Sequence, residues 1–318
     1  MEEMRFAPLR FAPLRFEGRV AVITGAGRGL GRAYALLLAE RGAKVVVNDL
    51  GGAIRGDLDA PGADVSVAQQ VVDEIVAAGG EAIANTDSVS TPEGGKAIIQ
   101  AALDQWGRID VLVHNAGNVR YGSIRDLSGA DLHSVLDVHL LGAFHVVQAA
   151  FGPMCDAGYG RIVLTSSVGG LYGNLNCVNY GMSKSAMLGL NNIAALEGEA
   201  HDVKCNVIVP GAVTRMAEGI DISQYPPMEP ELVAPVVGWL AHESCPVTGE
   251  MFASMAGRVA RMFVAETRGV YRPEWTIEDV AAASDAFHDK AEVLDFGLHG
   301  HVDHIGYSFR MATAGADA

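Results

Sequence analysis

The sequence predicts an α/β protein built on a doubly wound parallel sheet of about seven strands. Two observations lead to this expectation. Short apolar, β-branched runs alternate along most of the chain with helical stretches of about ten residues or more. A glycine-rich turn, G-A-G-R-G-L-G, separates the first apolar run from the first helical stretch. The 318 residues, 49% of them hydrophobic, suffice for one large core, so we expect a single domain.

The elements are expected to alternate, beginning with a strand over Arg19 to Thr24 and a helix over Arg32 to Arg41. The later strands are expected at Lys44 to Asn48, Glu81 to Asn85, Ile109 to Val113, Arg161 to Ser167, Lys204 to Val209 and Met251 to Ser254. The later helices are expected at Val65 to Ala78, Pro92 to Trp106, Asp131 to Asp156 and over a stretch that ends near His201. Short connections between such elements imply right-handed crossovers and a Rossmann-type sheet covered on both faces.

Three segments follow from this pattern: an N-terminal arm over residues 1–17, a dinucleotide-binding catalytic domain over 18–256, and a C-terminal extension over 257–318. The arm contains R-F-A-P-L twice, a unit too short for a structural repeat, and its prolines oppose a helix. The extension is expected to pack on the same domain, over the substrate mouth, or on a partner subunit. Within it, Thr276 is expected to cap a helix that runs to Ala283.

Composition excludes several classes of protein. A net charge of −15 and a pI near 5.0 leave no basic surface for nucleic acid or for an anionic membrane. The four cysteines lie far apart without a C-x-x-C pair, which argues against a disulfide framework or a zinc site. No apolar run reaches membrane-spanning length, and the N-terminus lacks the apolar core of a signal peptide. We therefore expect a cytoplasmic protein without a membrane span.

The glycine-rich turn predicts a dinucleotide site. Gly25, Gly29 and Gly31 form G-x-x-x-G-x-G between a strand and a helix, where glycines allow a tight turn and the helix N-terminus favours a pyrophosphate. Asp49 ends the second strand, where a carboxylate accepts hydrogen bonds from the adenosine ribose and repels the extra phosphate of NADP. We expect NAD, although an aspartate is also common in ordinary turns.

Further cofactor contacts are expected at the ends of neighbouring strands. Asp87 follows the third strand and could reach the adenine amino group. The fourth strand ends in H-N-A-G, of which Asn115, Ala116 and Gly117 should lie against the cofactor. The full set of expected cofactor-binding residues is Gly25, Arg28, Gly29, Leu30, Gly31, Asp49, Asp87, Ser88, Asn115, Ala116, Gly117, Tyr180, Lys184, Pro210, Gly211, Val213 and Thr214.

A serine, a tyrosine and a lysine form the expected catalytic set. Tyr180 and Lys184 stand four residues apart, which puts both side chains on one face of a helix. Lowering a phenol pKa from about 10 to about 7 requires about 4 kcal/mol, and an ammonium at roughly 4 Å in a dielectric of about 20 supplies a similar amount. Ser167 ends an apolar strand at the ligand-binding edge. The alternative is a chance pair on a helix beside a strand-terminal serine.

Four motifs together resemble the short-chain dehydrogenase/reductase family over roughly Gly18 to Ala256: T-G-A-G-R-G-L-G, N-A-G, the Ser167/Tyr180/Lys184 set, and P-G-A-V-T. Within that family, A-Y-A-L-L-L-A-E-R-G-A, V-V-V-N-D-L-G-G, L-Y-G-N and W-L-A-H-E-S-C are similar to the dehydrogenase modules of peroxisomal multifunctional enzymes of type 2. Bacterial relatives of those modules work in steroid side-chain degradation.

The resemblance implies NAD-dependent oxidation of a (3R)-hydroxyacyl-CoA to a 3-oxoacyl-CoA, with Tyr180 as base, Lys184 stabilising its anion and Ser167 binding the substrate oxygen. A bulky steroid-bearing thioester is the expected substrate. The alternatives are a 17β-hydroxysteroid dehydrogenase acting on a free steroid, and a protein that only binds the cofactor. The resemblance also implies that Val213 and Thr214 hold the carboxamide, that the protein is a homodimer or homotetramer, and that a separate enoyl-CoA hydratase works with it.

Three features leave their roles open. His139 stands where the wider family has an asparagine that helps to relay protons, so it could act as a relay or simply pack. Arginines of the extension could bind CoA phosphates, but a solvated basic face is the favoured interpretation; they are Arg258, Arg261 and Arg268. A surface role is likewise favoured over a metal site for the histidines of H-G-H-V-D-H, which are His299, His301 and His304, and we expect no catalytic metal.

Overall fold

The fold is known from a computed structural model, which describes residues 12–53, 64–214 and 224–314. Its centre is an eight-stranded sheet in the order β3-β2-β1-β4-β5-β6-β7-β8, which confirms the doubly wound α/β fold. The strands are β1 Val20–Thr24, β2 Lys44–Asn48, β3 Glu81–Asn85, β4 Val111–His114, β5 Gly160–Thr165, β6 Val203–Gly211, β7 Met251–Met255 and β8 Arg258–Met262. The first copy of R-F-A-P-L and part of the second lie outside the described residues.

The eighth strand corrects the expected sheet. β8 lies in the segment expected to be an extension and pairs antiparallel with β7, whereas all other neighbours in this sheet are parallel. Ala256 and Gly257 form the connecting turn, and both have positive φ, at 49° and 78°. Two-residue hairpins favour such turns because their twist matches that of the strands. The sequence R-V-A-R-M did not indicate a strand, because an edge strand needs neither continuous burial nor a long apolar run.

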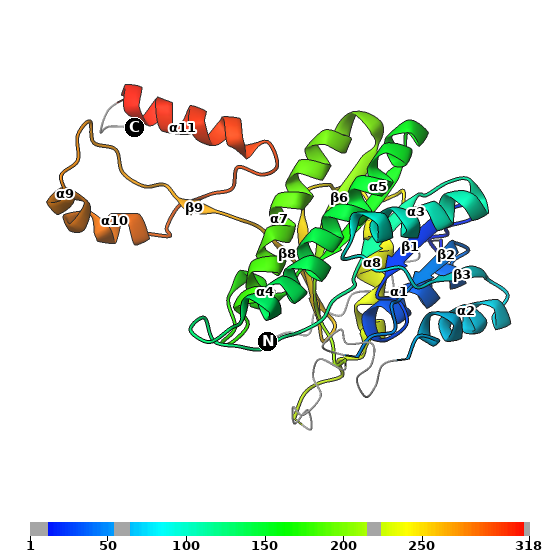
Figure 1. Ribbon diagram of the computed structural model, residues 1–318. Coiled ribbons are helices and arrows are strands. Elements are labelled where there is room, and N and C mark those ends of the chain that lie inside the picture. The colour runs from blue at the N-terminus through cyan, green and yellow to red at the C-terminus, as the bar shows by residue number, and fades with distance from the viewer. Residues whose placement is uncertain (1–11, 54–63, 215–223, 315–318) are drawn as a thin grey trace.

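Helices cover both faces of the sheet (Figure 1). On one face, a cluster of buried residues joins the sheet to α1 Gly29–Glu40, α2 Val67–Ala77 and α8 Ala234–Ala241. On the other face, a second cluster joins it to α3 Pro92–Trp106, α5 Gly142–Ala157 and α7 Val178–Gly198. Shorter helical pieces are α6 Val168–Leu171, η2 Glu199–His201 and η4 Pro230–Leu232. Because all of the central strands are buried on both sides, they are continuous apolar runs in the sequence.

One continuous helical stretch runs from α4 Gly129–Leu136 through a π-helical segment, η1 Asp137–Leu141, into α5. This 29-residue stretch is long and apolar enough to cross a membrane by length and composition alone, which corrects the expectation that no segment reaches that length. Its inward side chains, including Val146 and Met154, belong to the core cluster beneath the sheet. One face of the stretch therefore packs in the core, and 39% of its apolar window is buried inside the protein.

The strand order reverses beside β1, which has β2 on one side and β4 on the other. Loops from the carboxyl ends of β1 and β4 therefore separate there and leave room for a ligand. Thr24 and His114 are register partners at these two ends. The glycine-rich turn follows Thr24, and the N-A-G residues follow His114, so both motifs lie at this edge of the sheet.

The C-terminal segment stands beside the edge of the sheet, apart from the α/β body (Figure 1). It contains a small antiparallel pair, β9 Glu266–Thr267 with β10 Val293–Leu294, and three helices, α9 Ile277–Ala282, α10 Ser284–His288 and α11 Gly300–Ala314. Thr276 caps α9 in a full capping box with Asp279, which confirms the expected helix start.

Antiparallel β8 decides where this segment lies. Arg258 pairs with Met255 at the carboxyl end of β7, and Met262 pairs with Met251 at its amino end. The chain therefore leaves the sheet at the end opposite to the strand-terminal motifs. Its contacts with the body are at that amino end: Asp295 with Arg261, His299 with Glu199, and Leu298 beneath Gly249. These contacts do not place the segment over the substrate mouth of its own chain.

Candidate active site

The serine of the expected catalytic set lies just beyond its strand. β5 ends at Thr165, two residues earlier than expected, and Ser167 is the N-cap of the short helix α6. Its Oγ accepts a hydrogen bond from the Gly169 amide at 3.1 Å. The hydroxyl is thus fixed by a local cap rather than by the sheet, at the carboxyl edge where the glycine-rich turn also lies.

Tyr180 and Lys184 share one face of α7, as the four-residue spacing predicts. The Lys184 Nζ lies 5.7 Å from the centre of the Tyr180 ring. The same nitrogen donates a hydrogen bond of 2.6 Å to the Thr165 carbonyl, and Ser166 Oγ donates one of 2.7 Å to the Lys184 carbonyl. These two bonds tie α7 to the end of β5. The structure therefore brings the serine, the tyrosine and the lysine together at one place.

The electrostatics of this group differ from the sequence argument. Burial raises the pKa of Tyr180 above its ordinary value, and a hydrogen bond with Ser167 only partly opposes that effect. Burial also lowers the pKa of the Lys184 ammonium to about 7, since that side chain is only 3% exposed. Near neutral pH the lysine is thus charged in only part of the molecules. The expectation that this ammonium alone lowers the pKa of the Tyr180 phenol to near 7 was wrong, because it omitted the effect of burial on that pKa.

His139 is buried in the π-helical segment, beside the tyrosine. Its ring meets the Tyr180 ring edge-on, with the ring centres 5.3 Å apart. Its Nε2 lies 2.8 Å from the Asn118 carbonyl oxygen and 3.0 Å from the Asn118 amide nitrogen. The ring also fills the space where a Cβ on Gly117 would stand. Burial lowers the pKa of His139 well below its ordinary value, so the ring is neutral.

A second buried histidine, His114, was not among the expected site residues. Thr24 Oγ1 accepts hydrogen bonds from the Asn115 and Ala116 amides at 3.1 Å each, so its own proton goes to His114 Nδ1, also at 3.1 Å. The ring proton of this histidine therefore lies on Nε2. Burial lowers the pKa of His114 to about 3. A polar residue at the end of a buried strand, just before N-A-G, was the signal that could have identified it.

The glycine-rich turn fits a dinucleotide. Gly25 and Gly29 have positive φ, at 64° and 52°. A Cβ on Gly25 would lie 2.7 Å from the Ala116 Cα, and one on Gly31 would lie 2.2 Å from the Gly25 carbonyl oxygen. Side chains are thus excluded by backbone contacts, and the turn stays open. α1 starts at Gly29 without a side-chain cap, so its first amides are available for a pyrophosphate.

Asp49 lies directly beside this turn. Its two carboxylate oxygens accept hydrogen bonds from the Gly27 amide at 2.9 Å and the Gly51 amide at 2.8 Å. A Cβ on Gly27 would lie 2.9 Å from the same carboxylate. The acid is thereby held at the place where the second strand meets the glycine-rich turn. A carboxylate at this place can accept hydrogen bonds from the hydroxyls of a ribose.

The other expected cofactor residues are spread along the same edge. Asn115 donates from Nδ2 to the carbonyls of Thr24 and Gly25, which fixes N-A-G against the glycine-rich turn. Thr214 lies close to Gly29, and the Val213 amide donates to the Met228 carbonyl at 2.8 Å. One Asp87 oxygen accepts from Asn85 Nδ2 at 2.7 Å. The remaining expected residues occupy this edge as well: Arg28 and Leu30 on the turn, Ser88 after β3, and Pro210 and Gly211 at the end of β6.

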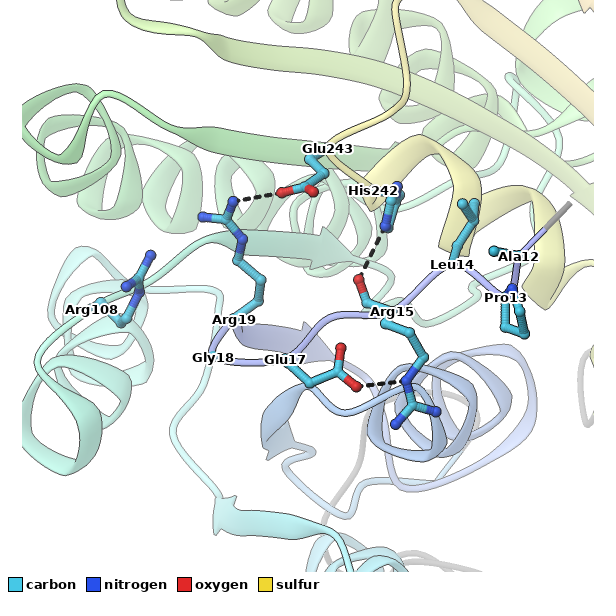
Figure 2. A pocket seen from close by; sticks show the side chains of 10 residues that line it. All are labelled: Ala12, Pro13, Leu14, Arg15, Glu17, Gly18, Arg19, Arg108, His242 and Glu243. Carbon is cyan, nitrogen blue, oxygen red and sulfur yellow. Dashed lines mark hydrogen bonds and ion pairs between the residues drawn. The ribbon is translucent and has the colours of Figure 1, made fainter.

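A cavity beside the N-terminal arm lies elsewhere in the molecule. About 520 Å³ lies between residues 12–19, Arg108 and the end of α8 (Figure 2), at the amino end of the sheet. Its charged groups bind one another: Arg19 pairs with Glu243 at 2.9 Å, and Arg15 pairs with Glu17 at 2.6 Å. His242 bonds the Arg15 carbonyl at 3.0 Å. The contacts around this cavity hold the described part of the arm against the domain, at the end of the sheet opposite to the serine, tyrosine and lysine.

Two of the three C-terminal histidines have separate partners. His299 Nε2 lies 3.7 Å from a Glu199 oxygen, and His304 Nε2 lies 3.4 Å from a Glu266 oxygen. Within the part of the chain that the structure describes, no group of three or more histidine, cysteine or acidic side chains is arranged to hold a metal ion. Arg261 pairs with Glu250 and Asp295, so this arginine is engaged in the protein itself.

Comparison with known proteins agrees with this geometry. The sequence profile described as short chain dehydrogenase matches residues 19–223. The chain is 51% identical over 261 residues to the peroxisomal multifunctional enzyme type 2 of Drosophila melanogaster, a match that covers 81% of this chain and 42% of that protein. It is 42% identical to a short-chain type dehydrogenase/reductase of Mycobacterium tuberculosis, over 84% of this chain and 92% of the other.

The fold comparison gives the same result. The solved structure of the full-length Drosophila enzyme superimposes with a TM-score of 0.76 at 40% identity, over 93% of this chain and 50% of that one. The chain spans about two fifths of the length of the Drosophila relative and about a third of the corresponding mouse protein.

Proposed function

The chain belongs to the short-chain dehydrogenase family, as an oxidoreductase acting on CH–OH groups, and from this premise we propose that it oxidises a (3R)-hydroxyacyl-CoA to the 3-oxoacyl-CoA with NAD. The observation that carries the proposal is the meeting of Ser167, Tyr180 and Lys184 at the edge of the sheet that also holds the glycine-rich turn. A protein that only binds a cofactor has no need of an aligned base.

In this proposal the protein's own groups handle the proton. The Ser167 hydroxyl binds the 3-oxygen of the substrate and orients the carbinol. Tyr180, as the phenolate, takes the proton of the 3-hydroxyl as general base. Lys184 stabilises that anion while it carries its own proton. The glycine-rich turn, Asp49, N-A-G, Val213 and Thr214 hold the NAD. When bound, NAD supplies the hydride acceptor and a positive charge.

His139 is proposed to return protons between this group and its surroundings. The Asn118 backbone offers both a donor and an acceptor to Nε2, so either neutral tautomer is satisfied there. The other ring nitrogen, Nδ1, is buried and has no hydrogen-bond partner among the described residues. A ring that can exchange tautomers at little cost is suited to relay a proton without becoming charged. An unaltered pH–rate profile for His139→Phe would remove this role.

NAD is proposed over NADP because of the Asp49 carboxylate. Asp49→Ser should raise the affinity for NADP relative to NAD by roughly tenfold, since a repulsive charge is removed. Equilibrium dialysis or quenching of protein fluorescence on binding measures this without turnover. Unchanged relative affinity would show that the carboxylate only orders the turn, through Gly27 and Gly51.

The acyl group is proposed to be bulky, with a steroid side chain as the favoured case, on the basis of the type 2 multifunctional enzyme resemblance.

We also propose a cytoplasmic homodimer or homotetramer that works with a separate enoyl-CoA hydratase. The extension beyond residue 256 is proposed to pack on its own domain or on a partner subunit. All four cysteines are free, which supports a reducing compartment. Light scattering of the purified protein and cell fractionation test these proposals.

The experiment for the reaction itself is a comparison of kcat/KM on a steroid side-chain (3R)-hydroxyacyl-CoA, its (3S)-epimer and a free 17β-hydroxysteroid, each with NAD and with NADP. We expect the (3R)-thioester with NAD to exceed the others by at least about tenfold. A wide preference for the free steroid would replace this proposal with a 17β-hydroxysteroid dehydrogenase. Absence of turnover on every alcohol would favour a binding protein.

A further inference from the structure

Two loops lie beside the catalytic serine and tyrosine. One is residues 118–127, which follow N-A-G, and the other is residues 172–177, between α6 and α7. The Gly122 amide donates to the Asn176 carbonyl at 2.9 Å, and Gly122 also forms an isolated bridge with Cys177. Cys177 is the N-cap of α7, the helix of Tyr180. The two loops are therefore joined to each other and to the helix of the catalytic base.

A second set of bonds fixes the first loop to the same helix. Asn179, buried beside Tyr180, donates from Nδ2 to the carbonyls of Arg120 at 2.9 Å and Asp131 at 3.2 Å. Tyr121 lies close enough to Tyr180 to contribute to its raised pKa. Side chains on these loops thus stand at a defined place relative to the reacting hydroxyl.

The side chains that these loops present are apolar and exposed. Leu175 is 87% exposed, Ile124 85%, Tyr172 77% and Tyr121 63%; we call these four the apolar rim. Val168, directly after Ser167, is exposed as well and continues this surface towards the reacting groups. Apolar side chains gathered on two joined loops are unfavourable in water and are typical of a surface that a ligand covers.

The charge around the rim points to the kind of ligand. Residues 168–177 contain no charged side chain, although the whole chain carries a net charge of −15. On the other loop, Arg120 lies 3.9 Å from Asp131, and Arg125 and Asp126, an adjacent pair of opposite charge, are exposed after Ile124. The C-terminal segment touches the body at the opposite end of the sheet, as its contacts with Arg261, Glu199 and Gly249 show. The four rim side chains carry no charge themselves, and two of them, Tyr172 and Leu175, lie on a loop without any charged residue in an acidic protein.

We infer that the apolar rim binds the apolar body of the substrate beyond its reacting carbinol, so that Ile124 and Leu175 select long-chain or ring-bearing acyl groups over short ones. This inference rests on the proposed function, which supplies the reacting group and the thioester. A short acyl chain ends before it reaches the rim, whereas a long or fused-ring chain lies across it and excludes water from it.

The test compares two thioesters that share the reacting centre. Wild type, Ile124→Ser, Leu175→Ser and the double variant are assayed with (3R)-hydroxybutyryl-CoA and with a (3R)-hydroxyacyl-CoA carrying a long or steroid acyl group. Each single variant should lose roughly tenfold in kcat/KM on the bulky substrate, mainly through a higher KM, and less than about twofold on the short one. Ile277→Ser is the matched control, because Ile277 is also 85% exposed but lies on α9 of the C-terminal segment.

The outcomes separate the two proposals. Equal losses of kcat/KM on both substrates would mean that the rim only supports the catalytic helix. Unchanged kcat/KM on both substrates in the double variant would mean that the substrate does not lie there. Either result overturns the inference. Loss of the oligomer in the double variant, seen by light scattering, would show an interface between copies instead. If wild type turns over neither thioester, the proposed function itself has failed, a result that cannot be confused with a change in the ratio.

Discussion

The two ends of the central sheet differ in how fully their buried polar groups are paired. At the amino end, the buried carboxylate of Asp110 accepts hydrogen bonds from Arg19, from Arg108 and from the Val20 amide. The Arg19 guanidinium also stacks 3.7 Å from the centre of the Tyr159 ring. Each of these charges has a partner, so this end contributes to stability.

At the carboxyl end, polar groups are buried with fewer partners. Nδ1 of His139 and Oγ1 of Thr165 have no hydrogen-bond partner among the described residues, and burial shifts the pKa values of Tyr180 and Lys184 towards their neutral forms. Such groups cost folding free energy. Paired charges at the amino end thus stabilise the fold, whereas the groups at the carboxyl end, which we propose to be catalytic, are buried at a cost in stability.

The largest expected effect comes from removing the proposed base, Tyr180, at the carboxyl end. Tyr180→Phe should lower kcat by about 10³- to 10⁴-fold, because the phenyl ring fills the same space but cannot take a proton. The free energy of unfolding should change by less than about 1 kcal/mol. Steady-state kinetics and urea denaturation of the same preparation measure both quantities.

Tyr159→Phe is the matched change at the amino end. The ring would still stack on Arg19 and Arg161, so neither kcat nor stability should change appreciably. If Tyr180→Phe kept full turnover, or if Tyr159→Phe lost it, the assignment of chemistry to one end of the sheet would be wrong.

Removing the central carboxylate at the amino end should have the opposite signature. Asp110→Ala removes the buried acceptor of the Val20 amide and of two guanidinium groups, and we expect a loss of about 3 kcal/mol in the free energy of unfolding. The kcat of the folded protein at low temperature should stay within about twofold. A large fall in kcat with unchanged stability would contradict the comparison.

Lys184 should make stability depend on pH. Its pKa is about 7 in the folded protein, against about 10.4 when unfolded, so the unfolded chain binds more protons between these values. The free energy of unfolding should therefore rise with pH above 7, by about 2 kcal/mol between pH 7 and 8.5, and the slope from this group should disappear below about pH 6. Lys184→Met should abolish that slope in denaturation curves, and Lys44→Met, at a partly exposed ion pair, should keep it.

The smallest expected effect is at the solvent side of the amino end. Arg19 pairs with Glu243, but that carboxylate is mostly exposed, with 61% of the side chain accessible. Glu243→Gln should lower the free energy of unfolding by less than about 1 kcal/mol, and added salt should reduce the difference further. A loss as large as that of Asp110→Ala would mean that exposure does not separate these two pairs.

Local signals explain why much of the fold was predictable. The expected bounds of β2 and of α3 match the structure residue for residue. For α3 the reason is visible: Thr91 caps the start, Pro92 is the first helical residue, and Gly107 ends the helix with a φ of 71°. Tyr180 and Lys184 share a helix face because a four-residue spacing guarantees it.

Features that depend on distant parts of the chain were not predictable in this way. β8 exists because β7 offers an edge, and the π-helical segment around His139 leaves no local mark in the sequence. The pKa values of Tyr180 and Lys184 depend on how much protein surrounds them, which a spacing cannot express. The Thr24–His114 hydrogen bond likewise joins two strands that are far apart in the chain.

The most direct test of the account is a spectroscopic titration of the Tyr180 phenol, taken as the difference between wild type and Tyr180→Phe, with and without saturating NAD. The account predicts a pKa above 10 for the protein alone, because burial dominates, and a fall of at least about one unit when NAD contributes its positive charge. A phenol that ionises below 10 without NAD, or one whose pKa does not respond to NAD, would contradict it.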